Sequence, residues 1–189
     1  MIRIGILGDI GSGKSYVASN FGYPVFNADY EVSKLYASNK KLFLKLNKKL
    51  PKDIYSYPIN KNQITKAILR NQTNLKTIIA VVHKEIRKKM KLFLKKNKNK
   101  RIVVLDIPLL LENKINNKND ILVFVDSKKK DIHKRLKKRK NFNSELLNKF
   151  KKIQLPPAYK KKKSQFIIKN NFTKKTIIRK IEYILNQIN

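Results

Sequence analysis

The segment Gly8–Ser15, with the sequence GDIGSGKS, constrains this chain more than any other feature. It matches the phosphate-loop pattern G-x-x-x-x-G-K-[ST], and it lies between an apolar run and a segment with helical spacing, Tyr16–Phe21. Glycines let the backbone curl so that successive N–H groups face an anion, and the following helix adds its positive end. The chain's own residue frequencies predict about 0.002 chance matches, so we expect a strand–loop–helix unit that binds nucleotide phosphates.

Short runs rich in β-branched residues predict the strands around this loop. Segments with helical spacing, such as Leu75–Met90 and Ile177–Ile188, separate several of them, and this alternation favours an α/β fold. Two of the runs are almost continuously apolar, as is typical of a parallel sheet covered on both faces. The five predicted strands are Arg3–Leu7, Pro24–Asn27, Arg101–Asp106, Ile121–Val125 and Phe166–Lys169.

Two stretches between strands are longer than a simple crossover needs. The first, from Asn27 to Arg101, is mostly helical in pattern and predicts an inserted helical subdomain. The second, from about Ser127 to Ser164, is basic and helical, and Pro156 and Pro157 must break any helix there.

Composition excludes several classes of protein. No cysteine is present, which excludes disulfides, a cysteine-based zinc site and a thiol nucleophile. No stretch approaches the roughly 18 apolar residues of a membrane span, and the N-terminal apolar run is too short for a signal peptide. At 189 residues, we expect a single cytoplasmic unit without membrane contact.

The net charge is +34, from 46 Lys and Arg against 12 Asp and Glu. Such a field attracts nucleotides and nucleic acids alike and identifies no partner. Lysine runs such as Lys128–Lys130 and Lys160–Lys163 lack the interleaved aromatic residues of a base-stacking surface, so we interpret them as solvated faces. We expect only non-specific, salt-sensitive binding to nucleic acid.

Two other classes of phosphate-loop protein fit less well. Asn117–Asp120 matches the N-K-x-D motif of GTPases, but about 0.2 chance matches are expected, and the motif precedes an apolar run instead of following it. Motor-type ATPases usually end a strand with paired acids. Here Asp106 is followed by Ile107 and Pro108, which favours transfer to an acceptor over hydrolysis.

Taken together, these motifs resemble the dephospho-CoA kinase family. The resemblance implies a P-loop NTPase fold of the nucleoside-monophosphate-kinase type, with a five-stranded parallel sheet, ATP and Mg²⁺ as cofactors, and phosphorylation of the ribose 3′-hydroxyl of dephospho-coenzyme A. It divides the chain into a core (1–29, 99–127 and 164–189), a helical substrate region (30–98) and a lid (128–163). The residues that carry it are Gly8–Ser15, Val25–Asp29, His83, Asp106–Glu112, Arg135, Leu136, Arg139, Gln154 and Phe166–Asn170.

Site residues follow from the loop motif and the resemblance. Lys14 would reach the β- and γ-phosphates, and the Ser15 hydroxyl would hold Mg²⁺, with Asp106 as a further ligand through water. Arg135 and Arg139, four residues apart, would lie on one helix face and approach the transferring phosphate, Arg139 in a catalytic role. The expected nucleotide contacts are Gly8, Gly11, Ser12, Gly13, Lys14, Ser15, Tyr16, Arg135 and Asn170.

Asp29 matches the proposed base of the family, since an alcohol attacks phosphorus better as its proton is removed. Its alternative role is the N-cap of a helix beginning at Tyr30. His83 is either a packed core histidine or a substrate contact, and Asp106 either binds substrate or pairs with Lys14. The expected substrate contacts are Asp29, His83, Asp106, Pro108 and Leu109.

The chain departs from the family pattern at Asp9, Asn27 and Ser33, where the family usually has Gly, Asp and Arg. Alternative functions are a small P-loop kinase for a nucleoside monophosphate or a polyol, and a basic nucleic-acid-binding P-loop protein. The sequence does not indicate the oligomeric state.

Overall fold

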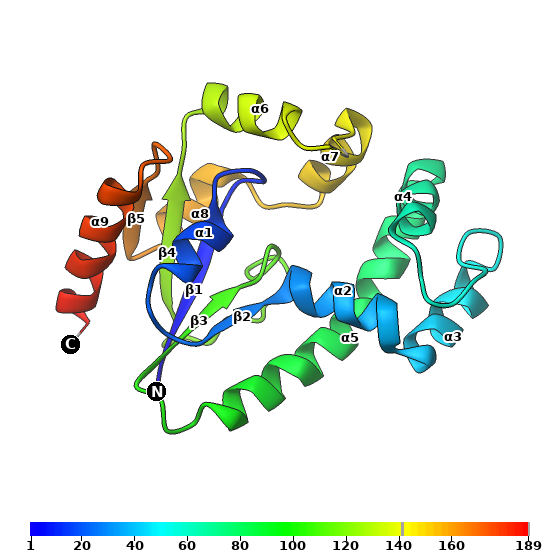
Figure 1. The fold of residues 1–189 in the computed structure, drawn as a ribbon, viewed down its shortest axis with the longest axis horizontal. Coiled ribbons are helices and arrows are strands. Elements are labelled where there is room, and N and C mark those ends of the chain that lie inside the picture. The colour runs from blue at the N-terminus through cyan, green and yellow to red at the C-terminus, as the bar shows by residue number, and fades with distance from the viewer. Residues whose placement is uncertain (141, 189) are drawn as a thin grey trace. The chain divides into compact units, whose positions relative to one another are not determined.

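A five-stranded parallel sheet organises the part of the chain that carries the phosphate loop (Figure 1). The structure is a computed structural model that describes residues 1–140 and 142–188. The strand order is β2-β3-β1-β4-β5. The strands are β1 Ile2–Gly8, β2 Val25–Asn27, β3 Ile102–Asp106, β4 Ile121–Asp126 and β5 Phe166–Lys169. Because all five run in one direction, their carboxyl ends share one edge, where open α/β sheets bind ligands.

The predicted α/β class and parallel sheet are confirmed, and each strand lies within one residue of its predicted ends. The helix after the phosphate loop begins at Lys14, two residues earlier than predicted. From the sequence, Arg101–Asp106 is expected to be the central strand; this is wrong, because β1 lies at the centre of the order, between β3 and β4. All five residues of β3 are buried, so its apolar run reflects cover on both faces and not a central place in the order.

The chain divides into two compact units. The sheet unit comprises Met1–Asn27, Asn97–Phe142 and Ile153–Asn189, and the helical unit comprises Ala28–Lys96 and Asn143–Lys152. Asn141 of the expected lid and Asn189 of the expected core lie outside the described residues. The helices of the sheet unit are α1 Lys14–Ser19, α6 Lys129–Lys137, α8 Pro157–Lys163 and α9 Lys174–Gln187.

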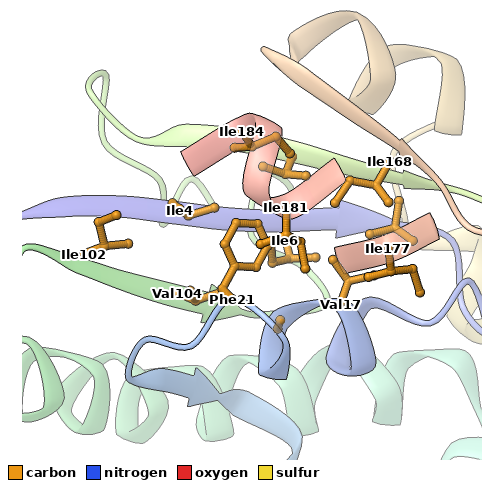
Figure 2. Close-up of a cluster of buried hydrophobic side chains, with 13 residues drawn as sticks. Ile4, Ile6, Val17, Phe21, Ile102, Val104, Ile168, Ile177, Ile181 and Ile184 are labelled. Atoms are coloured by element: carbon orange, nitrogen blue, oxygen red, sulfur yellow. The ribbon is translucent and has the colours of Figure 1, made fainter. Parts of the chain in front are cut away.

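Helices α1 and α9 pack on the same face of the sheet. Figure 2 shows Val17 of α1 and Ile177, Ile181 and Ile184 of α9 converging on Ile6 and its neighbours. All of these side chains are at most 3% exposed. Since side chains alternate across a strand, Gly5 faces the opposite side, where a Cβ would come within 2.6 Å of Leu110. A side chain at position 5 would therefore force the Leu110 and Leu122 side chains to shift.

The helical unit is built around the 25-residue helix α5. Its buried residues recur at the spacing seen in the sequence and include Leu75, Ile78, Val82, Ile86 and Met90. Helices α2, α3 and α4 contact α5, and α7 contacts α4. The helices of this unit are α2 Ala28–Ser38, α3 Lys40–Lys49, α4 Lys61–Arg70, α5 Gln72–Lys96 and α7 Ser144–Lys152.

The basic stretch after β4 forms α6, α7 and α8, and α8 begins at Pro157, where proline suits the first helical turn. None of the described helices is long and apolar enough to cross a membrane.

Candidate active site

The phosphate loop connects β1 to α1 in a conformation that its glycines make possible. Gly11 and Gly13 have φ angles of 88° and 92°, in the region that L side chains rarely adopt. The Ser12 N–H donates to the Asp9 carbonyl at 3.1 Å, which closes the turn. The loop therefore has the curled backbone that the motif predicts.

The Lys14 ammonium lies over the loop. Its Nζ donates to the carbonyls of Gly8 and Asp9, at 3.1 and 2.8 Å. These bonds fold the cation onto the peptide groups that would surround a bound phosphate. Ser15 and Tyr16, the next two residues of α1, are exposed to solvent.

Two loops that follow neighbouring strands hold the phosphate loop at Ser12. The Ser12 carbonyl accepts hydrogen bonds from Asn170 Nδ2 at 2.7 Å and from Ser127 Oγ at 2.9 Å. Asn170 follows β5 and is 3% exposed, and Ser127 follows β4. Asn170 is among the residues predicted to contact the nucleotide, whereas Ser127 is not, although its place directly after a predicted strand is an available signal.

Helix α6 packs against the loop at Gly11. A Cβ at Gly11 would lie 3.0–3.1 Å from side-chain atoms of Leu136 and Ile132. The guanidinium of Arg135, near the end of α6, stacks 4.1 Å above the ring of Phe172. Phe172 has a φ of 65°, which is rare for a large side chain. Its position beside the loop was not predicted, because no sequence signal marks it.

Arg139 does not share a helix face with Arg135, contrary to the prediction. Helix α6 ends at Lys137, and Arg139 lies in the following bend, where its N–H donates to the Leu136 carbonyl. Its side chain is exposed. The catalytic role expected for Arg139 stays a prediction.

Asp106, the last residue of β3, is a buried carboxylate with 4% exposure. Asn27 lies opposite it in register at the end of β2 and donates from Nδ2 to Asp106 Oδ2 at 2.8 Å. No group of three or more His, Cys, Asp or Glu side chains in the described part of the chain could hold a metal ion alone. Ser15 and Asp106 stay candidates for holding Mg²⁺, an ion that is usually held by one or two carboxylates together with phosphates.

Asp29 and His83 belong to the helical unit. Asp29 is the second residue of α2, which begins at Ala28, so it is not the N-cap of a helix starting at Tyr30. A carboxylate in the first turn is nonetheless favourable, because it faces the positive end of the helix dipole. His83 lies on α5 and is partly buried. Both residues stay candidates for substrate binding.

Pro108 and Leu109 lie in the loop after β3, and both are partly exposed. This loop continues to Glu112, whose Oε1 lies 3.4 Å from Lys160 Nζ and accepts the Leu155 N–H at 3.0 Å. Lys160 also donates to Gln154 Oε1 at 3.1 Å. Lys160 is 1% exposed, so the interpretation of its lysine run as a solvated face is wrong at this position. The buried ammonium is paired with the Glu112 carboxylate and hydrogen-bonded to the Gln154 side chain, as buried charges need to be.

The N-K-x-D motif has a structural role. The Asp120 carboxylate accepts the Asn117 backbone N–H at 2.9 Å and pairs with Arg3 of β1, also at 2.9 Å. Burial raises the pKa of Asp120, and the bonds from Asn117 and Arg3 partly offset this increase. The motif thus closes a turn before β4 and does not follow a strand as in a guanine site.

Comparison with known proteins agrees with this geometry. A sequence model of the dephospho-CoA kinase family matches residues 2–175. A dephospho-CoA kinase from Wolbachia sp. subsp. Brugia malayi (strain TRS) is 31% identical over 190 residues, which cover 98% of this chain and 97% of the relative. The crystal structure of TT1252 from Thermus thermophilus superposes with a TM-score of 0.77 at 25% identity and covers 100% of this chain and 98% of its own. A dephospho-CoA kinase from Campylobacter jejuni shares the fold, with a TM-score of 0.61 at 20% identity and 99% and 97% coverage.

Proposed function

The chain belongs to the dephospho-CoA kinase family, and we propose that it transfers the γ-phosphoryl group of ATP to the ribose 3′-hydroxyl of dephospho-coenzyme A. The observation that carries this proposal is the phosphate loop, which has left-handed glycines at positions 11 and 13 and the Lys14 ammonium folded over it. The reaction is a phosphotransfer to an alcohol.

The sheet unit would bind the nucleotide. Backbone N–H groups of the loop would surround the β-phosphate, and Lys14 would exchange its bonds to the Gly8 and Asp9 carbonyls for bonds to the β- and γ-phosphates. This exchange keeps the ammonium hydrogen-bonded in both states. Tyr16, Arg135 and Asn170 complete the nucleotide contacts that we propose.

Ser15 and Asp106 would hold Mg²⁺ together with the phosphates. The ion would neutralise charge on the phosphate oxygens during transfer. Asn27 donates to Asp106, so the buried carboxylate keeps a compensating hydrogen bond whether or not the ion is bound.

Asp29 would accept the proton of the attacking 3′-hydroxyl, and His83, Asp106, Pro108 and Leu109 would contact dephospho-coenzyme A. The region 30–98 would supply substrate binding. The segment 128–163, with Arg139, would act as a lid over the core (1–29, 99–127 and 164–189) and exclude water that could otherwise be phosphorylated.

A substrate panel tests this function. ADP release is measured with ATP and Mg²⁺ in the presence of dephospho-coenzyme A, AMP, CMP, gluconate or no acceptor. We expect rapid release with dephospho-coenzyme A and a low background with the others. Turnover on AMP, CMP or gluconate without turnover on dephospho-coenzyme A would contradict the assignment and favour a different small kinase.

A further inference from the structure

The carbonyl of Ser12 accepts two side-chain hydrogen bonds that come from two different loops. Asn170 Nδ2 donates at 2.7 Å and Ser127 Oγ at 2.9 Å. Ser12 is fully buried and Asn170 is 3% exposed. Both of a carbonyl's acceptor positions can be used in this way, so this peptide group is held from two directions.

Fixing this carbonyl also fixes the next N–H. A trans peptide is planar, with its C=O and N–H pointing in opposite directions. Because the Ser12 carbonyl points toward Asn170 and Ser127, the Gly13 N–H points away from both of them. Rotation of this peptide would turn a carbonyl oxygen toward the anion and cost the loop one of its donors.

Asn170 is itself fixed by neighbouring backbone. Its Oδ1 accepts the Phe172 N–H at 2.8 Å, which leaves the amide NH₂ facing Ser12. Its own N–H donates to the Asp126 carbonyl at the end of β4, at 2.7 Å. A Cβ at position 13 would lie 2.5 Å from Asn170 Nδ2, so the approach of Asn170 depends on Gly13.

We propose that Ser127 and Asn170 are positioning residues that hold the Ser12–Gly13 peptide with its N–H directed at the phosphate of a bound nucleoside triphosphate. Residues that follow β4 and β5 would then fix the backbone conformation of the phosphate loop, which follows β1. This inference rests on one part of the proposed function, which is that the loop binds phosphate. It refines the role proposed for Asn170, which would act on the nucleotide through its hydrogen bond to the Ser12 carbonyl.

The sequence offers a direct probe of this peptide, because Ser12-Gly13 is the one place where glycine follows serine. Protein made by cell-free synthesis with ¹³C′-serine and ¹⁵N-glycine therefore gives a single carbonyl-filtered amide signal, that of Gly13. The ligand is inorganic tripolyphosphate, which has no base or sugar. Its affinity is measured by calorimetry beside that of ATP.

The variants are Ser127→Ala, Ser127→Thr and Asn170→Ala. The matched control is Ser164→Ala, since Ser164 Oγ also donates to a backbone carbonyl, that of Lys160, at 2.9 Å. We expect Ser127→Ala to weaken tripolyphosphate binding about 3–10-fold, as for the loss of one hydrogen bond. The affinity of Ser127→Ala for ATP should fall by the same factor. Ser127→Thr, which keeps a hydroxyl, should bind tripolyphosphate as the wild type does, and so should the Ser164→Ala control.

The labelled signal separates positioning from general stability. In the wild type the Gly13 amide should shift when tripolyphosphate binds, and in Ser127→Ala and Asn170→Ala it should already be displaced in the free protein. Wild-type affinity and an unchanged Gly13 signal in folded Ser127→Ala would overturn the proposal, even if Asn170→Ala failed to fold. If the expected pattern appears but dephospho-coenzyme A is not phosphorylated, the proposed function fails and this inference stands.

Discussion

Substitution of Lys14 tests the proposed chemistry of the phosphate loop most directly. Lys14→Ala removes the charge that would neutralise the phosphates, so we expect phosphoryl transfer to fall about 10²–10³-fold, as for other preorganised donors. Its side chain is only partly buried, so the thermal midpoint measured by circular dichroism should change little. The exposed Lys169→Ala is the control, and near-normal turnover of Lys14→Ala would count against the assigned role.

Asp29→Asn keeps the size of the side chain and removes its ability to accept a proton. We expect kcat to fall about 10²–10⁴-fold, the usual contribution of a general base. ATP affinity, measured by calorimetry, should stay close to that of the wild type. An unchanged kcat would contradict the role of Asp29 as a base and would indicate that it only stabilises the first turn of α2.

Residues with a backbone role were the most predictable part of the site. The glycines of the loop are fixed by geometry that the motif encodes, so their positions followed from the sequence. The roles of three other residues could not be predicted, because each depends on a partner distant in the chain. Ser127 bonds to Ser12, Phe172 stacks with Arg135, and Lys160 pairs with Glu112. A single sequence does not show which residues pair in this way; it marks Ser127 only by its place directly after a predicted strand.

Among the elements, α8 is joined to the loop after β3 by the buried pair Lys160–Glu112. Lys160→Met leaves the Glu112 carboxylate buried without its cation, and we expect a loss of about 3–5 kcal/mol of unfolding free energy. The double variant Lys160→Met/Glu112→Leu should recover much of this loss. Urea denaturation measures both, with the exposed Lys162→Met as control. A Lys160→Met variant as stable as the wild type would contradict the expected cost of burying Glu112 without its cation.

Helices α3 and α5 are linked by Lys45 and Glu85, which lie 2.9 Å apart. The hydrogen bond from Lys45 lowers the pKa of Glu85. The folded state therefore favours the ionised form of Glu85. The resulting contribution to the free energy of unfolding is present above the unfolded-state pKa of about 4.3, and it is lost as the pH falls through the pKa of the folded state.

Thermal unfolding midpoints measured as a function of pH should show the contribution of ionised Glu85 to stability. Between pH 7 and pH 3 the wild type should lose more stability than Glu85→Gln, which has no charge to lose. Parallel curves for the two proteins would contradict the effect.

Element boundaries were predictable wherever apolar spacing defined them. The strands follow their apolar runs closely, whereas α5 begins three residues before Leu75 and ends six residues after Met90. Helix α6 ended earlier than expected because its buried residues, Ile132 and Leu136, have no apolar successor: position 140 is Lys140. Lysine itself is a good helix former, so nothing in the local composition marks the end.

At the scale of the whole molecule, the net charge of +34 sets the background against which specific binding must be measured. We expect RNA binding to be weak and to fall at least tenfold between about 50 and 200 mM salt, as for counterion release without specific contacts. Fluorescence anisotropy with a labelled single-stranded RNA measures this. Tight binding at physiological salt, with ADP release stimulated by RNA, would favour a nucleic-acid-dependent function instead.

The central claim is that the outermost phosphoryl group of ATP reaches one particular hydroxyl. Phosphorus NMR of the reaction of purified protein with ATP, Mg²⁺ and dephospho-coenzyme A tests it directly. We predict one new phosphomonoester signal, coupled to the ribose 3′-hydrogen and formed in equal amount to ADP. ADP accompanied by free phosphate, or a phosphoester at another position of the substrate, would contradict the account.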